Sequence, residues 1–337
     1  MITYNHEKFI AQAIESVLMQ ETDFEVELVI GEDCSADGTR QIVQQYAVRY
    51  PQVIRALLTE HNLGMQQNAS RVLAAVKGTY VAILEGDDYW TDARKLSRQV
   101  EMMDADSTLS LCFHRVMEYD ELQQSDGAIL PGHDVRDFKN PAKELIRCNF
   151  IPSNSRLMRR SMLPIFDQDY QKLKLGDWPC SIIMTLNGTI QFLPEVMSVY
   201  RIHHRGSWNG LDLETQEAAI YEMFNYLYAH AVISTRDLIA CGLISYSRLV
   251  LLHHSFKRRR DWIAFAGTSL QIPYRLGPWS FTVQAACILL TLLLPRYIMR
   301  QIYQACNVMQ RLENLKPHSL RSILLKRWQD FWINIGS

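Results

Sequence analysis

The chain has 337 residues, of which 48% are hydrophobic and 21% are charged, and its formal net charge is −1. This composition supplies enough apolar material for a packed core, and it excludes a disordered chain or a fibrous repeat. The balance of 35 basic and 36 acidic residues also argues against a uniformly basic nucleic-acid-binding protein.

The cysteines and the first residues indicate the cellular compartment. The seven cysteines are scattered and form no Cys-x-x-Cys pair. An odd number without metal-ligand spacing argues against a disulfide framework or a structural zinc site, and it suits a reducing compartment. No signal peptide is predicted, because Glu7 brings charge early and no long apolar run precedes it. We therefore expect a cytoplasmic protein.

Hydrophobic periodicity predicts strands alternating with helices through the N-terminal half. Apolar side chains at helical spacing predict a helix over residues 7–20, with Asn5 as its N-cap. The elements expected next are a strand at 26–30, a helix from Asp37, a strand at 53–58, a helix at 65–76, a strand at 80–84 and a helix at 92–104. This alternation indicates a mostly parallel sheet covered on both faces, whose ligands bind beyond the carboxyl ends of the strands.

The middle of the chain is expected to complete this sheet. The expected elements are strands at 109–119 and 191–201, an extended segment at 150–160 and a helix at 179–187. Residues 123–140 are polar and rich in turn formers, which predicts a mobile loop. Residues 212–256 have a mostly helical pattern, and we expect their aromatic side chains to lie in a core.

The last part of the chain is basic. Residues 255–337 carry twelve Lys or Arg and three Asp or Glu, so the rest of the chain is acidic. Residues 279–294 form a charge-free, mostly apolar stretch of 16 residues, whereas a bilayer crossing needs roughly 20. Three interpretations stay open: a buried helix with a solvated basic face, an in-plane helix attracted to anionic lipid, and a true crossing. We expect peripheral membrane contact through residues 255–337.

Two acidic pairs end predicted strands: Glu32 with Asp33, and Asp87 with Asp88. We expect them to face one crevice, because the carboxyl ends of parallel strands meet at one edge of a sheet. Neither GxGxxG nor GxxxxGK[ST] occurs, so a phosphate ligand would need other means of neutralisation. Adjacent carboxylates can supply it through Mg²⁺ or Mn²⁺. By itself an Asp-Asp pair fits equally well with a turn that caps the following helix.

Further motifs accompany these pairs. They are Thr3-Tyr4-Asn5, ESVLMQ at 15–20, GEDCSADGT at 31–39, Asn62-Leu63-Gly64, KGTY at 77–80, EGDDYW at 85–90 and Gly176-Asp177-Trp178. In this order, over roughly residues 1–205, the chain resembles the family-two inverting glycosyltransferases with the GT-A fold. The resemblance implies an α/β catalytic domain at 1–210, with a Rossmann-like, mostly parallel sheet flanked by helices. A helical C-terminal region that includes the basic tail would follow at 211–337.

The resemblance also implies a sugar-nucleotide donor and assigns residues to it. Tyr4 matches the aromatic residue that stacks on the base, and Asp33 matches the carboxylate that accepts a hydrogen bond from the base. Asp87 and Asp88 match the aspartate motif, in which one carboxylate contacts the ribose and another binds the metal on the diphosphate. Which of the two ligates the metal stays open. Glu85 stands where many relatives have aspartate.

Two further residues gain roles from the resemblance. Asp177 matches the catalytic base. His203 lies where relatives often carry a histidine that ligates the metal or touches the diphosphate, and Arg205 would add positive charge. From the residues alone, Asp177 could instead be a helix N-cap, and His203 an ordinary loop histidine.

The reaction implied is a single displacement with inversion. Mn²⁺ or Mg²⁺ would stabilise the departing nucleoside diphosphate, and Asp177 would take the proton of the attacking hydroxyl. A UDP-sugar is the favoured donor, and the acceptor would be a glycan or lipid-linked molecule in cell-surface polysaccharide or glycolipid synthesis at the inner membrane face. The alternatives are a polyprenyl-phosphate glycosyltransferase and a non-catalytic sugar-nucleotide-binding or scaffold protein.

Overall fold

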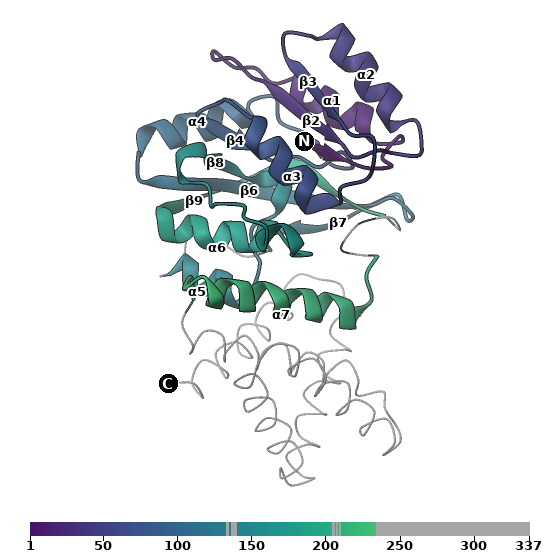
Figure 1. The fold of residues 1–337 in the computed structure, drawn as a ribbon. Helices are drawn as coiled ribbons and strands as arrows, with labels where there is room; N and C mark the ends of the chain where they lie inside the picture. Colours follow the sequence, from purple (N-terminus) through teal and green to yellow (C-terminus); the bar gives the residue numbers. More distant parts are fainter. Residues whose placement is uncertain (133–134, 136–139, 204–205, 207, 209, 234–337) are drawn as a thin grey trace, which may run out of the picture. The chain divides into compact units, whose positions relative to one another are not determined.

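The computed structural model describes residues 1–132, 135, 140–203, 206, 208 and 210–233 (Figure 1). These residues lie within one compact unit that ends at position 234. The basic tail, the apolar stretch at 279–294 and Arg205 lie outside the described residues, so the predictions made for them stay predictions. Within the described part of the chain, none of the helices has both the length and the apolar character that a bilayer span requires.

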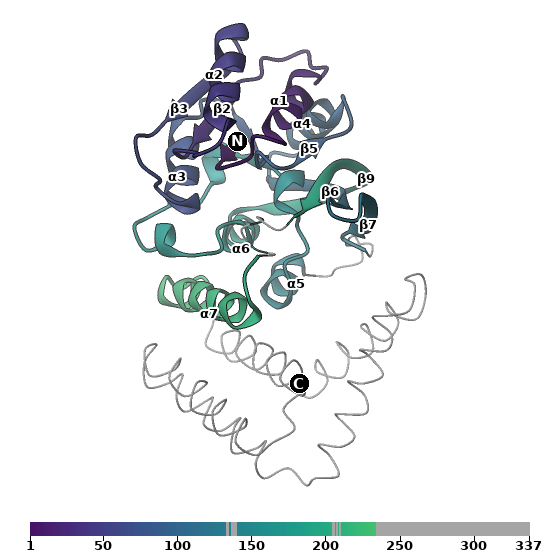
Figure 2. The ribbon, with the colours of Figure 1, turned by 90° about the vertical axis from the view of Figure 1, so that its right-hand side faces the viewer.

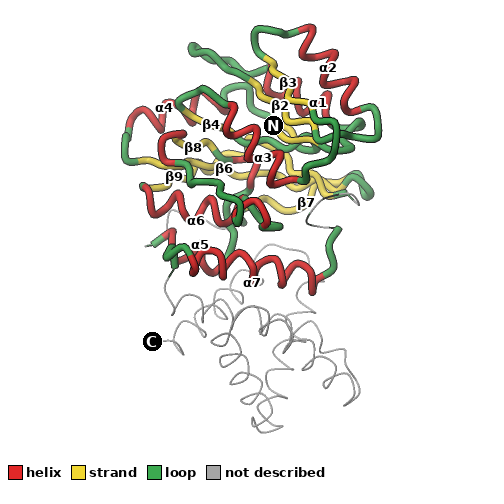
Figure 3. The backbone as a smooth tube through the Cα atoms, in the orientation of Figure 1, coloured by secondary structure: helices red, strands yellow, loops and turns green. Residues whose placement is uncertain are grey.

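The N-terminal part forms a three-stranded parallel sheet in the order β1-β2-β3. Its central strand is buried along its whole length, which explains why its sequence begins with an uninterrupted apolar run. Helix α3 packs against β2, helix α2 against β3, and helix α1 against α2 (Figure 3). The bounds are β1 (Ile2–Thr3), α1 (Ile10–Leu18), β2 (Leu28–Glu32), α2 (Thr39–Arg49), β3 (Ile54–Leu58) and α3 (Met65–Ala75).

A second, six-stranded sheet follows the order β4-β8-β6-β9-β5, with β7 paired to β6. In this sheet β6 and β9 run parallel, and the other pairs are antiparallel. The expected class, a sheet of α/β type flanked by helices, is confirmed, although antiparallel pairs join the parallel ones. The strands are β4 (Tyr80–Ala82), β5 (Tyr89–Trp90), β6 (Leu109–Asp120), β7 (Ser125–Leu130), β8 (Leu157–Arg159) and β9 (Thr189–Ile202).

Helices cover the second sheet on both faces. Helix α4 packs on β6 and β8, whereas α6 packs on β6 and β9 from the opposite face, with α5 and α7 outside it (Figures 1 and 2). Their bounds are α4 (Lys95–Ala105), α5 (Pro141–Arg147), α6 (Asp177–Asn187) and α7 (Leu213–Ala229). The two sheets meet at a parallel bridge between Ile2 and Glu85, which brings the end of β1 beside the loop after β4.

The predicted N-cap of the first helix is wrong. Helix α1 begins at Ile10, and Phe9 occupies the N-cap position. The amides of Phe9 and Ile10 both bind the carbonyl oxygen of His6, so a separate turn precedes the helix. Asn5 instead lies in the left-handed region with φ 56°, and its Oδ1 accepts a hydrogen bond from the amide of Ala36 at 2.9 Å.

The prediction of a mobile loop over residues 123–140 is wrong in part. Ser125–Leu130 form β7, which pairs with the end of β6 as an antiparallel hairpin. Five of its six residues are exposed, so no apolar alternation marks this strand in the sequence.

Candidate active site

The candidate site lies where the loop between β4 and β5 meets the end of β9 and the start of α6. Glu85 lies in the loop between β4 and β5, and its pKa is raised first by burial and then by the negative charges of Asp87 and Asp177. The segment before β8 links the aspartate motif to the expected base, because Asn154 Nδ2 donates to Asp88 Oδ2 at 2.9 Å and Arg156 Nη1 donates to the Asp177 carbonyl at 3.0 Å.

The two aspartates of the motif have different surroundings. Asp88 is 1% exposed, and its two oxygens accept hydrogen bonds from the amide of Arg201 at 2.8 Å and from Asn154 Nδ2 at 2.9 Å. Burial, and then the charges of Asp87 and Glu85, raise the pKa of Asp88 well above its usual range. Both oxygens of the Asp88 carboxylate are thus already bound by protein donors.

Asp87 instead presents a side chain that is 18% exposed, with Oδ2 at 3.0 Å from His203 Nε2. Burial raises the pKa of Asp87, but the hydrogen bond with His203 and the charges of His6 and His203 outweigh it, and the pKa lies below its usual value. Two of the residues expected to bind metal, far apart in the sequence, are therefore in direct contact.

His6 is a second imidazole at this carboxylate, which the sequence reasoning missed. Its Nε2 lies 3.5 Å from Asp87 Oδ2, and its Nδ1 lies 3.3 Å from Thr3 Oγ1. A Cβ atom on Gly86 would lie 2.5 Å from Thr3 Oγ1 and 3.0 Å from His6 Nδ1, so this close approach requires a glycine. Burial lowers the pKa of His6, which favours the neutral ring.

The donor set at this point suits a divalent cation in part. A carboxylate and an imidazole about 3 Å apart match the spacing of neighbouring ligands on one ion, and this mixture of oxygen and nitrogen is suited to Mn²⁺. Within the described ranges, however, no group of three or more His, Cys, Asp or Glu side chains is placed to hold a metal ion. A cation at Asp87 and His203 would need further ligands from a bound molecule or from water.

Arg201 stabilises the aspartate loop, which is residues 83–88 between β4 and β5. The sequence reasoning missed this role too. Its Nη1 donates to the backbone carbonyl of Asp87 at 2.5 Å, and its Nε lies 2.7 Å from Glu121 Oε1. The guanidinium also lies over the rings of Phe9 and Tyr89, at 5.0 and 4.4 Å from their centroids. These contacts fix the loop on β9 and leave the Asp87 side chain facing His203.

The residues expected at the base of a nucleotide lie at neighbouring strand ends. Tyr4 directly follows β1 and is 45% exposed. The amide of Asp33 donates to the carbonyl of Thr3 at 3.1 Å, so the ends of β1 and β2 lie side by side. The Asp33 carboxylate is buried and accepts hydrogen bonds from the amides of Leu63 and Gly64, at 2.8 and 2.9 Å. It thereby holds the turn that starts α3, where Gly64 has φ +84°.

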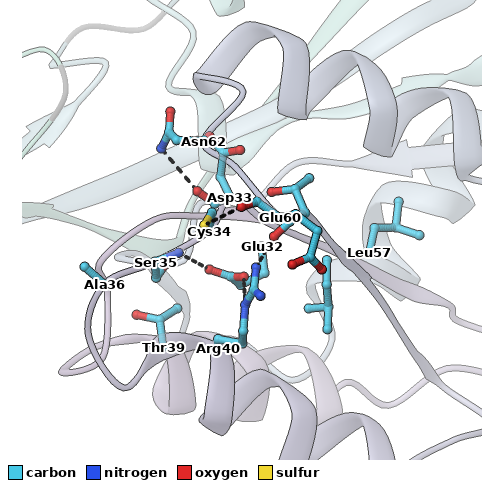
Figure 4. Close-up of polar contacts among 12 residues, drawn as sticks. Glu32, Asp33, Cys34, Ser35, Ala36, Thr39, Arg40, Leu57, Glu60 and Asn62 are labelled. Atoms are coloured by element: carbon cyan, nitrogen blue, oxygen red, sulfur yellow. Dashed lines mark hydrogen bonds and ion pairs between the residues drawn. The ribbon is translucent and has the colours of Figure 1, made fainter.

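Glu32 stabilises the loop that follows β2 (Figure 4). It is completely buried, and its carboxylate accepts hydrogen bonds from the amide of Ser35 at 2.6 Å and from Arg40 Nε at 2.7 Å. Glu32 therefore contributes to the local structure, as the buried Asp33 does, whereas Tyr4 is exposed at the adjoining strand end.

Asp177 is the first residue of α6, and the N-cap position belongs to Gly176. Its side chain is therefore not the cap that the position alone allowed. The Asp177 carbonyl accepts hydrogen bonds from Arg156 Nη1 at 3.0 Å and from Ser181 Oγ at 2.9 Å. Its Oδ2 accepts a hydrogen bond from Asn149 Nδ2 at 2.8 Å.

Comparison with known proteins identifies the relatives of this chain. Residues 1–165 match the family described as glycosyl transferase family 2. A Mycobacterium tuberculosis protein of uncharacterised function is 39% identical over 208 residues, which are 62% of this chain and 59% of that protein. The Bacillus subtilis glycosyltransferase TuaG, named for teichuronic acid biosynthesis, is 35% identical over 119 residues, which are 35% of this chain and 46% of TuaG. The chain thus spans about three fifths of the first relative and less than half of the second.

A solved structure shares the fold. Staphylococcus aureus TarS 1–349 in complex with UDP-GlcNAc superposes with a TM-score of 0.57 at 18% sequence identity, over 93% of this chain and 90% of that chain. At this low identity the likeness shows the fold alone, and it confirms the expected GT-A architecture.

Proposed function

We propose that this chain, whose residues 1–165 match glycosyl transferase family 2, transfers a sugar from a nucleoside diphosphate donor to an acceptor hydroxyl with inversion. The observation that carries the proposal is that the segment before β8 binds Asp88 through Asn154 and Asp177 through Asn149 and Arg156, next to the contact between Asp87 and His203. The carboxylate of Asp87 and the imidazole of His203 can bind a divalent cation on a diphosphate, and the carboxylate of Asp177 can accept a proton.

Asp87 and His203 are the residues we propose to hold the divalent cation. Asp88 is the weaker candidate, because two protein donors already occupy its carboxylate. Asp87 and His203 would thereby hold, when the cation is bound, a charge that stabilises the departing diphosphate. Because one of the two ligands is an imidazole, we expect Mn²⁺ to be bound more tightly than Mg²⁺.

Tyr4 and Asp33 are the residues we propose for the base of the donor. The exposed ring of Tyr4 is available for stacking. Asp33 lies at the adjoining strand end and is the weaker of the two candidates, because its buried carboxylate already accepts hydrogen bonds from two backbone amides. The UDP-GlcNAc bound in TarS, a protein of the same fold, supports a uridine donor. The name of TuaG supports a role in cell-surface polysaccharide synthesis, with a glycan or lipid-linked acceptor.

Asp177 is the residue we propose as general base. It would take the proton of the acceptor hydroxyl as that oxygen attacks the anomeric carbon from the face opposite the diphosphate. One displacement inverts the anomeric centre, and no covalent enzyme intermediate forms.

The catalytic domain would cover residues 1–210. Residues 211–337 would follow, and their basic part at 255–337 would contact anionic lipid at the inner membrane face.

Asp177→Asn tests the proposal. Release of UDP from UDP-GlcNAc and related UDP-sugars is measured with Mn²⁺ and an acceptor or water, and UDP binding is measured by calorimetry. We expect the variant to bind UDP as the wild type does and to lose turnover by about 100-fold or more. Asp169→Asn is the matched control, because Asp169 is an exposed aspartate paired with Lys172. A folded Asp177→Asn protein with the turnover of this control would refute the assignment.

A further inference from the structure

We propose that Asn149 is a positioning residue for the general base, an inference that rests on the proposed function of Asp177. Asn149 lies two residues beyond α5, and its Nδ2 donates to Asp177 Oδ2 at 2.8 Å. Among the described residues, this is the hydrogen bond that the structure gives to the Asp177 carboxylate. The reaction needs one oxygen of that carboxylate to face the acceptor hydroxyl, so the group that fixes its rotation matters.

The orientation of the Asn149 amide is set by Asp177. The opposite flip of the amide would place Oδ1 against a carboxylate oxygen, and two acceptors repel each other. In the observed orientation, Asn149 Oδ1 is buried and has no hydrogen-bond partner among the described residues. Leaving a buried carbonyl unpaired is unfavourable. The Asn149 amide is therefore held in this orientation by its hydrogen bond to Asp177, and among the described residues its own oxygen contributes no hydrogen bond.

Both ends of this hydrogen bond are anchored by other contacts. On the Asn149 side, the neighbouring Phe150 is buried and lies 5.9 Å from the ring of Phe113. Helix α5 is fixed to α6 through Trp178 Nε1, which donates to the carbonyl of Leu145 at 2.6 Å.

On the other side, Arg156 and Ser181 hold the backbone carbonyl of Asp177. Because the backbone is held on both sides, the Asp177 side chain can still rotate about its own bonds and turn its carboxylate. Asn149 removes this rotation by engaging Oδ2, and this leaves Oδ1 to receive the proton.

Asn149→Leu tests the inference, because leucine has a similar size and no donor. The matched control is Asn187→Leu. Asn187 is at the other end of α6, and its Nδ2 donates to the Met162 carbonyl at 2.8 Å, away from the site. Release of UDP from UDP-GlcNAc is measured with Mn²⁺ for both variants and for Asn149→Asp, which keeps the shape of the side chain but replaces the donor by an acceptor.

We expect kcat to fall about 10- to 100-fold in both Asn149 variants, which is the size of effect that follows from losing a hydrogen bond to a charged group. KM for UDP-GlcNAc and the melting temperature should stay near those of Asn187→Leu, because the donor site and the core are untouched. Unchanged kcat in Asn149→Leu, or a loss explained by a raised KM or by unfolding, would overturn the inference.

The inference and the proposed function can fail separately. Turnover by the wild type that is unaffected by Asn149→Leu overturns the inference alone. If the wild type releases no UDP from any UDP-sugar, the proposed function fails, and crystal structures of the wild type and Asn149→Leu then decide the inference. A rotated Asp177 carboxylate in the variant supports a positioning role, and an unchanged one overturns it.

Discussion

Replacing Asn154 by alanine should destabilise the protein strongly, because this residue ties the aspartate loop to the second sheet. Asn154 is completely buried. Its Nδ2 donates to Asp88 Oδ2 at 2.9 Å and to the carbonyl of Val199 at 3.0 Å, and its Oδ1 accepts from Ser198 Oγ at 3.3 Å. Alanine removes all three bonds and leaves a buried carboxylate and a buried carbonyl without this donor.

The expected magnitude follows from these contacts. A buried polar group that loses its partner costs about 1–3 kcal/mol, and the carboxylate lies at the upper end of this range. For Asn154→Ala the sum is about 3–5 kcal/mol, a large part of the typical 5–15 kcal/mol of a folded protein. At roughly 2–4 °C per kcal/mol, the melting temperature should fall by about 6–20 °C.

Urea unfolding followed by tryptophan fluorescence measures this effect, since Trp90 Nε1 donates to the carbonyl of Asn154 itself at 3.1 Å. Asn187→Ala is the control, because Asn187 is exposed and makes one bond, to the carbonyl of Met162. Its free energy of unfolding should change by no more than about 1 kcal/mol. Equal unfolding midpoints for Asn154→Ala and Asn187→Ala would refute the reasoning.

Two further predictions concern charge and metal. Burial lowers the pKa of Lys95 to about 7, so between pH 7 and about 10 the unfolded chain binds a proton that the folded one lacks. The free energy of unfolding of the wild type should therefore rise with pH relative to Lys95→Met, measured by urea unfolding, and a constant difference would contradict this. His203→Ala should weaken Mn²⁺-dependent UDP binding about tenfold or more in calorimetry and leave binding in EDTA unchanged, whereas the C-cap variant His230→Ala should match the wild type.

The sequence was sufficient for the order of the longer helices and strands and for the strand ends that carry the acidic pairs, but it did not predict β5, β7 or α5. The buried apolar run of β2 and the turn at Asn62-Leu63-Gly64 each leave a local signal, so their positions were predicted within a few residues. The hairpin strand β7 leaves no such signal in the sequence, because five of its six residues are exposed.

The different roles of Asp87 and Asp88 had a signal that the sequence reasoning did not use. Burial alternates along this segment: Gly86, Asp88 and Trp90 are buried, and Asp87 is more exposed. In extended backbone, alternate side chains share a face. The large aromatic Trp90 therefore indicates that Asp88, two residues before it, points inward with it, whereas Asp87 lies in the turn that precedes this strand.

The contacts of Asn149, Asn154 and Arg201 could not be predicted from spacing. Asn154 lies 66 residues from its partner Asp88, and Arg201 lies 114 residues from the Asp87 carbonyl that it binds. Such pairs depend on how β9 and the segment before β8 approach the aspartate loop, which only tertiary packing determines.

The most direct test of the central claim is the melting temperature with UDP, measured with and without Mn²⁺, for the wild type and Asp87→Asn. A ligand that binds only the folded state adds about 2.7 kcal/mol at 100 times its Kd, which corresponds to roughly 5–10 °C. We predict this shift for the wild type with UDP and Mn²⁺ together, a smaller one with UDP alone, and no effect of Mn²⁺ on Asp87→Asn. An unchanged melting temperature with UDP, GDP and dTDP in the presence of Mn²⁺ would contradict the assignment of a metal and nucleotide-sugar site.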